Sequence, residues 1–539
     1  MKRVATAMHV GTTKRTYKGK TYVTYLLRQT YREGGKVKHR TLANLSHLPL
    51  ATIELIRRSL KGEVFLSASE ELKITASRSH GAVYAVLGMI RKLGLDQLIA
   101  SRNTQWRALV LAMVVARILE GGSKLFASRW WRGTTLPELL GLPTEGKVVN
   151  LLYEAMDKLL RRQGAIQKKL ARRHLQEGCL VLWDLTSSYL EGRTCPLAAF
   201  GKNRDGKKGK RQFTYGILTD SEGRPIAVEV FRGNMSDPLT VRPQIERLKE
   251  EFGFGHLVFV GDRGMVVKCR IEDLRKAGFS WITALRAKDI QRLRDEGLIQ
   301  LGLFDERDLA EISAPWLPGE RLIVCRNPLV AEERRRKRQE LLSATVRELA
   351  KIKESVDGGR LKKAKEIALR VGKVINRWKM GKHIELTIED GRFEYRLKED
   401  QIAREAELDG IYVIRTDVGP EKLSAQAAVS GYKSLKFVEQ DIRDTKAVLE
   451  LRPVFHRLED RVRCHAFLCL LAQYVRWHMM RALEPLLAEE KKHSFELLME
   501  HLETIQRNTM EVAGQQFNLT TQPDELHRRI FAHLGLPLP

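Results

Sequence analysis

The stretch Cys179-Leu-Val-Leu-Trp-Asp184 and its counterpart Leu257-Val-Phe-Val-Gly-Asp262 are two apolar runs that each end in an aspartate. Apolar runs of this length predict buried strands, here at 180–183 and 257–261. Ligands of α/β sheets bind beyond the carboxyl ends of the strands, so both aspartates are candidate site residues. One such aspartate is weak evidence, because strand ends routinely expose polar residues to solvent. In this chain two apolar runs each end in an aspartate, which strengthens the prediction of a site.

The segments around these two runs alternate in their predicted structure. Further strands are predicted at 213–219, 225–231, 281–285 and 409–416, and helices at 240–252 and 271–276. Three successive strands followed by helix, strand, helix and strand is the element order of an RNase H-like α/β fold. Many α/β folds share parts of this order, so it favours the fold without establishing it.

The chain carries a large excess of positive charge. Its 539 residues include 94 Lys and Arg against 66 Asp and Glu, a formal net charge of +28. Such an excess favours a polyanionic partner, either nucleic acid or an anionic membrane surface. No apolar stretch reaches the about 20 residues of a membrane span, which favours nucleic acid. The six cysteines form no CxxC pair and the N-terminus has no long apolar run, so we expect a reducing cytoplasm, without disulfides or zinc.

These patterns divide the chain into six segments. Residues 1–65 are predicted to form a mixed β/helical DNA-binding region, and 66–178 a helical DNA-binding domain. The RNase H-like catalytic domain is predicted in two parts, 179–289 and 406–482. An insertion domain at 290–405 separates them, with a charged helix at 331–356 and a strand pair at 384–388 and 393–397. Residues 483–539 are predicted as a helical tail for packing or self-association.

A third carboxylate, Glu439, lies on a stretch predicted as one helix from Tyr432 to Lys446. At about 100° per residue, one stripe of this helix is apolar and faces the core; its members are Leu435, Val438, Ile442 and Leu449. The adjacent stripe holds Tyr432, Lys436, Glu439, Arg443 and Lys446. A surface helix with an i,i+4 pair such as Glu439–Arg443, worth about 0.2–0.5 kcal/mol, explains the charges but not the tyrosine.

Tyr432, Glu439 and Lys446 match the spacing of Y-x(2)-R-x(3)-E-x(6)-K, and the chain thereby resembles the bacterial insertion-sequence DDE transposases of the IS-four-like group. The signature arginine is Leu435 here, and we hypothesise that Arg443 or Lys436 supplies the missing charge. Other stretches resemble one branch of the same group; they are 231–237, 260–265, 379–383, 408–412 and 451–456. The resemblance runs from about residue 20 to 485.

This resemblance implies a DNA transposase that binds the ends of an insertion sequence, cleaves there and joins the 3′-OH ends to target DNA. It implies that Asp184, Asp262 and Glu439 are catalytic and hold two divalent cations, Mg²⁺ by preference, with Mn²⁺ as a substitute. The implied partners are double-stranded DNA, as terminal inverted repeats and as target, and a second copy of the chain in a homodimer. The implied location is cytoplasmic and nucleoid-associated.

The residues expected to contact DNA form three groups. Four lie on the Glu439 helix: Tyr432, Lys436, Arg443 and Lys446. Five others follow the two aspartates: Arg263, Lys207, Lys208, Lys210 and Arg211. In the insertion, Trp316 and Trp378 are candidates for stacking on a flipped base, against the alternative that both are core tryptophans.

Two other functions stay open from the sequence. A catalytically silent DNA-binding descendant of a transposase would keep the fold without the reaction, although all three carboxylates are present. An RNase H-like nuclease would hydrolyse DNA without joining it. A Mg²⁺-dependent nicking assay distinguishes a transposase from the silent descendant. A strand-transfer assay with a pre-cut 3′-OH end distinguishes it from the nuclease.

Overall fold

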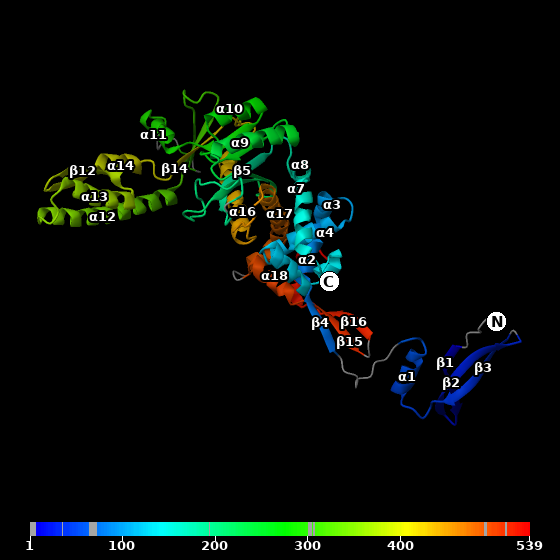
Figure 1. Ribbon diagram of the computed structural model, residues 1–539. Helices are drawn as coiled ribbons and strands as arrows, with labels where there is room; N and C mark the ends of the chain where they lie inside the picture. The colour runs from blue at the N-terminus through cyan, green and yellow to red at the C-terminus, as the bar shows by residue number, and fades with distance from the viewer. Residues whose placement is uncertain are drawn as a thin grey trace. The chain divides into compact units, whose positions relative to one another are not determined.

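The computed structural model describes residues 7–34, 36–63, 73–192, 194–299, 304, 308–489, 493–512 and 515–539. The chain divides into two compact units. The smaller unit combines Met1–Arg78 with Gln506–Thr521, and the larger combines Ser79–Ile505 with Gln522–Pro539. The elements of both are labelled in Figure 1.

The smaller unit contains two three-stranded sheets, of which the first is antiparallel throughout. The first has the order β1 (Ala7–Tyr17), β2 (Lys20–Glu33), β3 (Lys36–Asn44), and is followed by helix α1 (Leu50–Ser59). Val10, Leu45 and Ile53 form its small core. Strands followed by a helix are what the sequence predicts for this segment.

The second small sheet corrects the prediction of a wholly helical tail. Its order is β16 (Gln515–Thr520), β15 (Gln506–Val512), β4 (Lys73–Ser79). In sequence, helix α18 (Phe495–Glu503) precedes the hairpin and α19 (Glu525–Leu534) follows it. A strand needs a neighbour for its backbone groups, and β15 finds one in β4, far away in sequence. Local patterns do not reveal such a partner.

Seven α-helices follow β4 in the described chain before the main sheet begins, and some of them contact the long helix α17 (Glu459–Glu489). The seven are α2 (Gly81–Lys92), α3 (Leu95–Ile99), α4 (Gln105–Leu119), α5 (Lys124–Trp130), α6 (Leu136–Leu140), α7 (Val148–Leu160) and α8 (Gln163–His174). Helix α4 is buried along nearly its whole length, because α7 and α17 pack against it. The core of these helices continues into that of the main sheet, so the expected helical domain at 66–178 is not separately packed. Within the described ranges, no helix has the length and apolarity to cross a bilayer.

An eight-stranded mixed sheet forms the centre of the larger unit, in the order β10-β11-β14-β9-β8-β5-β6-β7. Its strands are β5 (Leu180–Tyr189), β6 (Gln212–Asp220), β7 (Pro225–Arg232), β8 (Val258–Gly261), β9 (Ser280–Ala284), β10 (Leu309–Ile312), β11 (Arg321–Arg326) and β14 (Ile411–Thr416). The β5–β8 and β8–β9 pairs are parallel, and the other pairs are antiparallel.

Helices cover this sheet (Figure 1). Helix α9 (Asp237–Glu246) packs on α10 (Lys268–Ala277), which contacts β9. Helix α15 (Ala425–Lys433) contacts β9 and β14, and α16 (Leu435–Ala447) contacts β5 and β6. The packing of α16 on β5 joins two segments that are far apart in sequence.

The insertion begins later than the predicted residue 290, because β10 and β11 extend the main sheet. Helix α11 (Ala287–Asp295) comes before these strands. The insertion consists of α12 (Pro328–Asp357), α13 (Ala364–Trp378), hairpin β12 (Ile384–Glu389)–β13 (Arg392–Leu397) and α14 (Glu399–Ala406). It has its own apolar core, built around Leu349, Ile367 and Phe393. The predicted charged helix and strand pair are confirmed.

Candidate active site

The register of two parallel strands places the aspartates side by side. Trp183 of β5 pairs with Gly261 of β8, and Asp184 and Asp262 are the next residues on each strand. Strand β8 ends there, as predicted. Strand β5 continues to Tyr189 because it stays paired with the longer β6, where Asp184 is opposite Ile217. Asp184 therefore lies inside a strand, at the point where the parallel pairing stops.

Helix α16 brings the third carboxylate to this edge of the sheet. Leu435, Val438 and Ile442 are buried, as the predicted stripe requires. Glu439 is exposed on the neighbouring face, and it lines a cavity of about 490 Å³ together with Asp184. The basic residues Lys446 and Arg452 line the same cavity.

The single helix predicted from Tyr432 to Lys446 is two helices in the structure. Helix α15 ends at Lys433 and α16 begins at Leu435, with Ser434 between them. The Ser434 hydroxyl donates to the Ser430 carbonyl at 3.0 Å, an example of the local side-chain bonding by which serine competes with regular helix. Tyr432 and Glu439 therefore belong to consecutive helices, and the prediction of a single helix is wrong.

Asp184 is an acid without an ion pair among the described residues. Burial raises its pKa to about 6, and the negative charges of Glu439 and Asp262 add to this shift. The backbone N–H of Leu185 and the charge of Arg204 act in the opposite direction. The three carboxylates are thus close enough to repel one another. The oxygens of the three carboxylates nevertheless do not all lie within 4.8 Å of one another, the spacing expected of atoms that share one metal ion.

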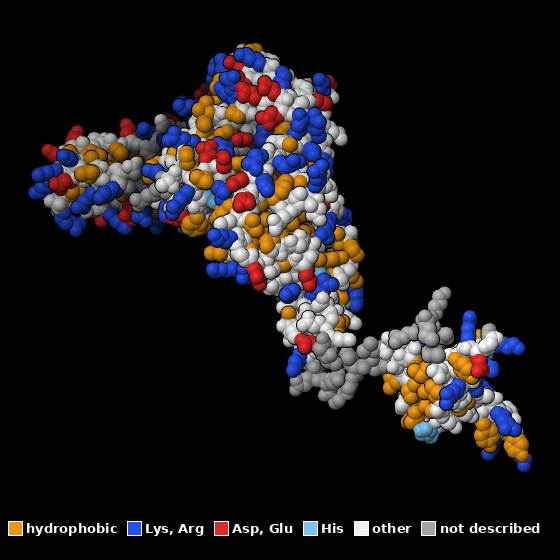
Figure 2. Space-filling view, turned by 45° about the vertical axis from the view of Figure 1, so that its right-hand side comes forward, with side chains coloured by type: hydrophobic (Ala, Val, Ile, Leu, Met, Phe, Trp, Pro, Cys, Tyr) orange, Lys and Arg blue, Asp and Glu red, His pale blue; other side chains and the backbone are white. Residues whose placement is uncertain are grey.

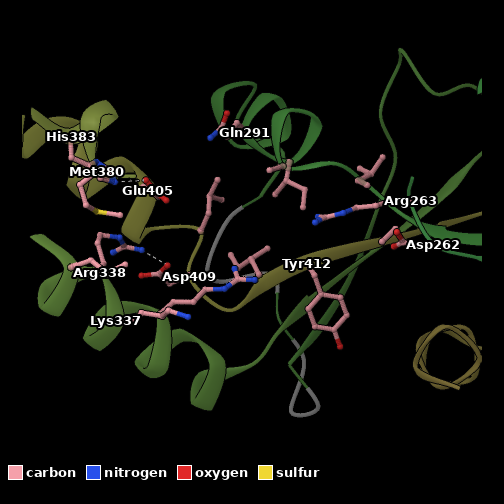
Figure 3. A pocket seen from close by; sticks show the side chains of 18 of the residues that line it. Asp262, Arg263, Gln291, Lys337, Arg338, Met380, His383, Glu405, Asp409 and Tyr412 are labelled. Atoms are coloured by element: carbon pink, nitrogen blue, oxygen red, sulfur yellow. Dashed lines mark hydrogen bonds and ion pairs between the residues drawn. The ribbon is translucent and has the colours of Figure 1, made fainter. Parts of the chain in front are cut away.

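Asp262 lines a second cavity, which extends toward the insertion. The Tyr432 hydroxyl donates to Oδ1 of Asp262 at 3.3 Å, and the Gly264 amide donates to Oδ2 at 3.4 Å. This cavity has a volume of about 550 Å³, and Lys337 and Arg338 of α12 line its other end. Figure 3 shows Asp262 and Arg263 at one side and the α12 residues at the other.

The comparisons with known proteins identify the family of this chain. Residues 177–474 match the family model described as the transposase DDE domain, which is more than half of the chain. The chain belongs to the DDE transposases. Residues 10–71 match the N-terminal domain of IS1634 family transposases, so this is an insertion-sequence transposase. Enzymes of this family act on DNA and depend on divalent cations.

Among solved structures, the transposase is similar to the cryo-EM structure of the piggyBac transposase synaptic complex with hairpin DNA. The sequences are 10% identical, and the match covers 78% of this chain and 76% of that one. The TM-score is 0.34, so no argument rests on this likeness. Among curated proteins, nothing matches.

The structure places Lys446 of the transposase differently from the sequence prediction. Its side chain is 8% exposed, and Nζ lies 2.8 Å from Oδ1 of Asp205 and 2.6 Å from the Thr186 hydroxyl. Burial lowers the pKa of Lys446, while the bond to Asp205 opposes this shift. The sequence predicts that Lys446 holds a DNA phosphate near the cut. Instead, the ammonium connects the loop after β5 to α16.

Asp205 is the residue that sequence reasoning missed. Its side chain is 2% exposed and also forms an ion pair with Arg452, and the Tyr189 amide donates to its other oxygen. The one available signal was that Asp205 is the single acid between Lys202 and Arg211. An isolated acid in a basic loop is a candidate for an internal ion pair.

The other basic residues predicted for DNA lie at the surface. Lys207, Lys208, Lys436, Arg443 and Arg263 are exposed. Lys210 pairs with Glu191 at 2.6 Å, and the Arg211 guanidinium lies 5.6 Å from the Phe200 ring centre. Lys and Arg side chains are spread over the visible face rather than gathered in one patch (Figure 2). For these seven side chains, contact with DNA stays a prediction.

The two candidate stacking tryptophans pack in cores of the transposase. The Trp316 indole donates to Glu296 at 2.9 Å, and the Arg292 guanidinium covers its ring at 4.4 Å. Trp378 packs against the apolar core of the insertion. Neither lines the cavity at Asp262, where the aromatic side chains are Tyr412 and Tyr432. The geometry favours the core alternative for both.

Proposed function

We propose that this transposase cleaves and joins DNA at the ends of its insertion sequence with Asp184, Asp262 and Glu439 as catalytic carboxylates. The observation that carries the proposal is the convergence of three distant acids on one edge of the sheet. The β5–β8 register places two of them there, and a shared cavity adds the third. The joined products would be 3′-OH ends linked to target DNA.

The donor set fits two Mg²⁺ ions, with Mn²⁺ as a substitute. Mg²⁺ prefers carboxylate oxygens, and Asp184 forms no ion pair within the described residues, although the charge of Arg204 acts on it. When bound, such ions activate the attacking oxygen and stabilise the leaving one. Repulsion among the three acids favours cation binding, since an added positive charge lowers the cost of keeping all three ionised.

The surrounding residues have positioning roles in this proposal. Tyr432 holds the Asp262 carboxylate through its hydroxyl, and Lys446 holds the basic loop through Asp205. Glu439 stands on the exposed face of α16 and can turn toward the aspartates when DNA fills the cavity. Lys436 and Arg443, exposed on the same helix, would contact DNA phosphates.

Arg443 is the better candidate to replace the arginine missing at position 435. Leu435 is buried in the apolar stripe, where a guanidinium would be desolvated without a partner. The Arg443 guanidinium lies 3.9 Å from Glu439. Arg443→Ala is expected to lower DNA cleavage more than Lys436→Ala does. Equal activities of the two variants would contradict this role.

We further propose that the sheet is RNase H-like, since meander β5-β6-β7 followed by parallel β8 and β9 is the expected order. In this proposal the Y-R-E-K relationship to the IS-four-like group also holds. The N-terminal segment at 1–65 and the helices at 66–178 bind the terminal inverted repeats. Two copies form a homodimer that holds two element ends.

The test is cleavage of a duplex carrying the element end, followed by strand transfer from a pre-cut 3′-OH end. Asp184→Asn, Asp262→Asn and Glu439→Gln should each abolish Mg²⁺-dependent cleavage. Glu421→Gln, at an exposed acid outside both cavities, is the matched control. Cleavage that survives all three substitutions would refute the assignment, and cleavage without strand transfer would favour a nuclease.

A further inference from the structure

A small basic cavity shares Arg452 with the candidate active site. Arg452 lines both the cavity at Asp184 and this one, which has a volume of about 180 Å³. Pockets for drug-sized ligands measure about 300–1,000 Å³, so this cavity suits a much smaller group. Helices α4 and α5, the loop at 450–456 and α17 form its walls.

Lys124, the first residue of α5, is the least compensated charge of this cavity. Lys124 is 4% exposed. Among the described residues, its Nζ has one hydrogen-bond partner, Nδ1 of His465 at 3.4 Å, and no carboxylate within 4.0 Å. Burying an ammonium without a counter-charge is strongly unfavourable, so an anion bound beside it would stabilise the charged form.

Arg117 of α4 is a second buried cation at the same cavity. It is 3% exposed, and its terminal nitrogens donate to the carbonyls of Leu449, Glu450 and Gly122. Its Nε has no partner in the part of the chain that the structure describes. The guanidinium is therefore held in place by neutral carbonyls, which leave its positive charge uncompensated.

The remaining polar walls do not supply a negative charge to Lys124 or Arg117. The Nε2 of His465 donates to the Leu451 carbonyl at 3.1 Å, which leaves Nδ1 as an acceptor toward Lys124. Burial lowers the pKa of His456 to about 3, so this ring is neutral. The one acid is Glu450, whose carboxylate accepts from the Gly122 amide at 2.7 Å. Within the described residues it forms no ion pair with either cation.

We propose that this cavity binds one phosphate group between Lys124 and Arg117. Its small volume, two buried cations and uncompensated charge match a compact anion, and Arg452 connects its wall to the cavity where DNA would be cut. The phosphate can come from the end of a DNA strand or from free inorganic phosphate. The DNA source rests on the proposed function, and the free source does not.

The first experiment titrates inorganic phosphate into the full-length protein by calorimetry, at an ionic strength held constant with potassium chloride. Lys124→Met keeps the length of the side chain and removes its charge, and it should weaken phosphate binding at least about tenfold. Lys158→Met, at an exposed lysine of α7, is the matched control and should bind as wild type does.

A second arm identifies the source of the phosphate. Duplexes of one sequence with a 5′-phosphate or a 5′-hydroxyl end are compared for binding to wild type and Lys124→Met. A preference for the phosphorylated end that Lys124→Met loses assigns the site to DNA; phosphate binding without such a preference assigns it to the free ion. If wild type shows neither, the proposal is overturned.

Two controls separate this site from the catalytic one and from a folding defect. Glu439→Gln should keep phosphate binding even though it loses cleavage, so failure of one assignment leaves the other intact. Phosphate should also raise the melting temperature of wild type above that in chloride at equal ionic strength. The absence of such a rise would overturn the proposal even if Lys124→Met did not fold.

Discussion

Two groups of potential metal ligands in the larger unit differ in whether their atoms are already used. The compact group, His501, Asp524 and His527, places its ligand atoms within 4.8 Å of one another. Asp524 caps α19 by accepting from the His527 amide at 2.9 Å, and the His527 ring accepts from the Asp524 amide at 3.1 Å. The other side of that ring faces the His501 carbonyl at 2.9 Å.

The carboxylates at the sheet edge are the opposite case. Asp184 has no ion pair in the described chain, Glu439 has one loose contact with Arg443 at 3.9 Å, and Asp262 has two long hydrogen bonds. Closeness alone therefore does not mark a metal site. The atoms of the compact group bond to one another and stabilise a helix end, whereas the three carboxylates repel one another, which in our proposal favours an added cation.

The largest expected effect tests this difference directly. Asp184→Asn should lower cleavage by about a thousandfold or more, because a lost cation removes several kcal/mol of charge stabilisation. His501→Ala should leave cleavage within about twofold. The measurement is the initial rate on element-end DNA at saturating Mg²⁺, and a larger loss in His501→Ala than in Asp184→Asn would reverse the comparison.

The second effect concerns Asp205, an acid whose partners are all internal. Asp205→Asn leaves the buried ammonium of Lys446 without its counter-charge, and it should lower the free energy of unfolding by about 3 kcal/mol. Urea denaturation of the variant and of the surface control Glu421→Gln measures this. A loss no greater than that of the control would mean that Lys446 is solvated in solution.

The third effect concerns pH and Lys124, a cation without a partner acid. Burial, with the Arg117 charge, lowers the pKa of Lys124 to about 7, while Cys464 and Cys469 act weakly in the opposite direction. Because the unfolded chain keeps a higher pKa, it binds more protons above pH 7, and stability should rise with pH there. The slope is at most about 1.4 kcal/mol per pH unit.

This slope is measured as the difference between wild type and Lys124→Met in unfolding experiments from pH 7 to 8.5, without phosphate. The variant should lack the rise. His465 and His456 face Lys124, but burial lowers the pKa of both, so they stay neutral across this range. Parallel pH profiles of the two proteins would mean that Lys124 is not desolvated.

The smallest effect belongs to the compact group. Asp524→Ala removes the cap of α19 and should cost about 1 kcal/mol of stability, with cleavage unchanged. Thermal unfolding with and without added Zn²⁺ gives the measurement. A large stabilisation by Zn²⁺ in wild type, absent in Asp524→Ala, would show that the compact group is a metal site after all.

The local sequence was sufficient for the six predicted strands of the main sheet, for Asp262 at the end of β8, and for the buried stripe of α16. These features depend on apolar periodicity and on short runs, which act within a few residues. It was also sufficient for the charged helix and hairpin of the insertion, whose apolar residues pack among themselves.

The partners of these residues came from contacts between distant segments. Strand β5 extends beyond Asp184 because β6 continues to pair with it, and β15 pairs with the distant strand β4. Lys446 forms an ion pair with Asp205, which precedes the insertion in sequence while Lys446 follows it. The cost of burying a charge depends on what surrounds it in space, and no local pattern contains that information. For this reason the sequence identified the candidate acids, while only the tertiary structure determined which of them have an internal partner.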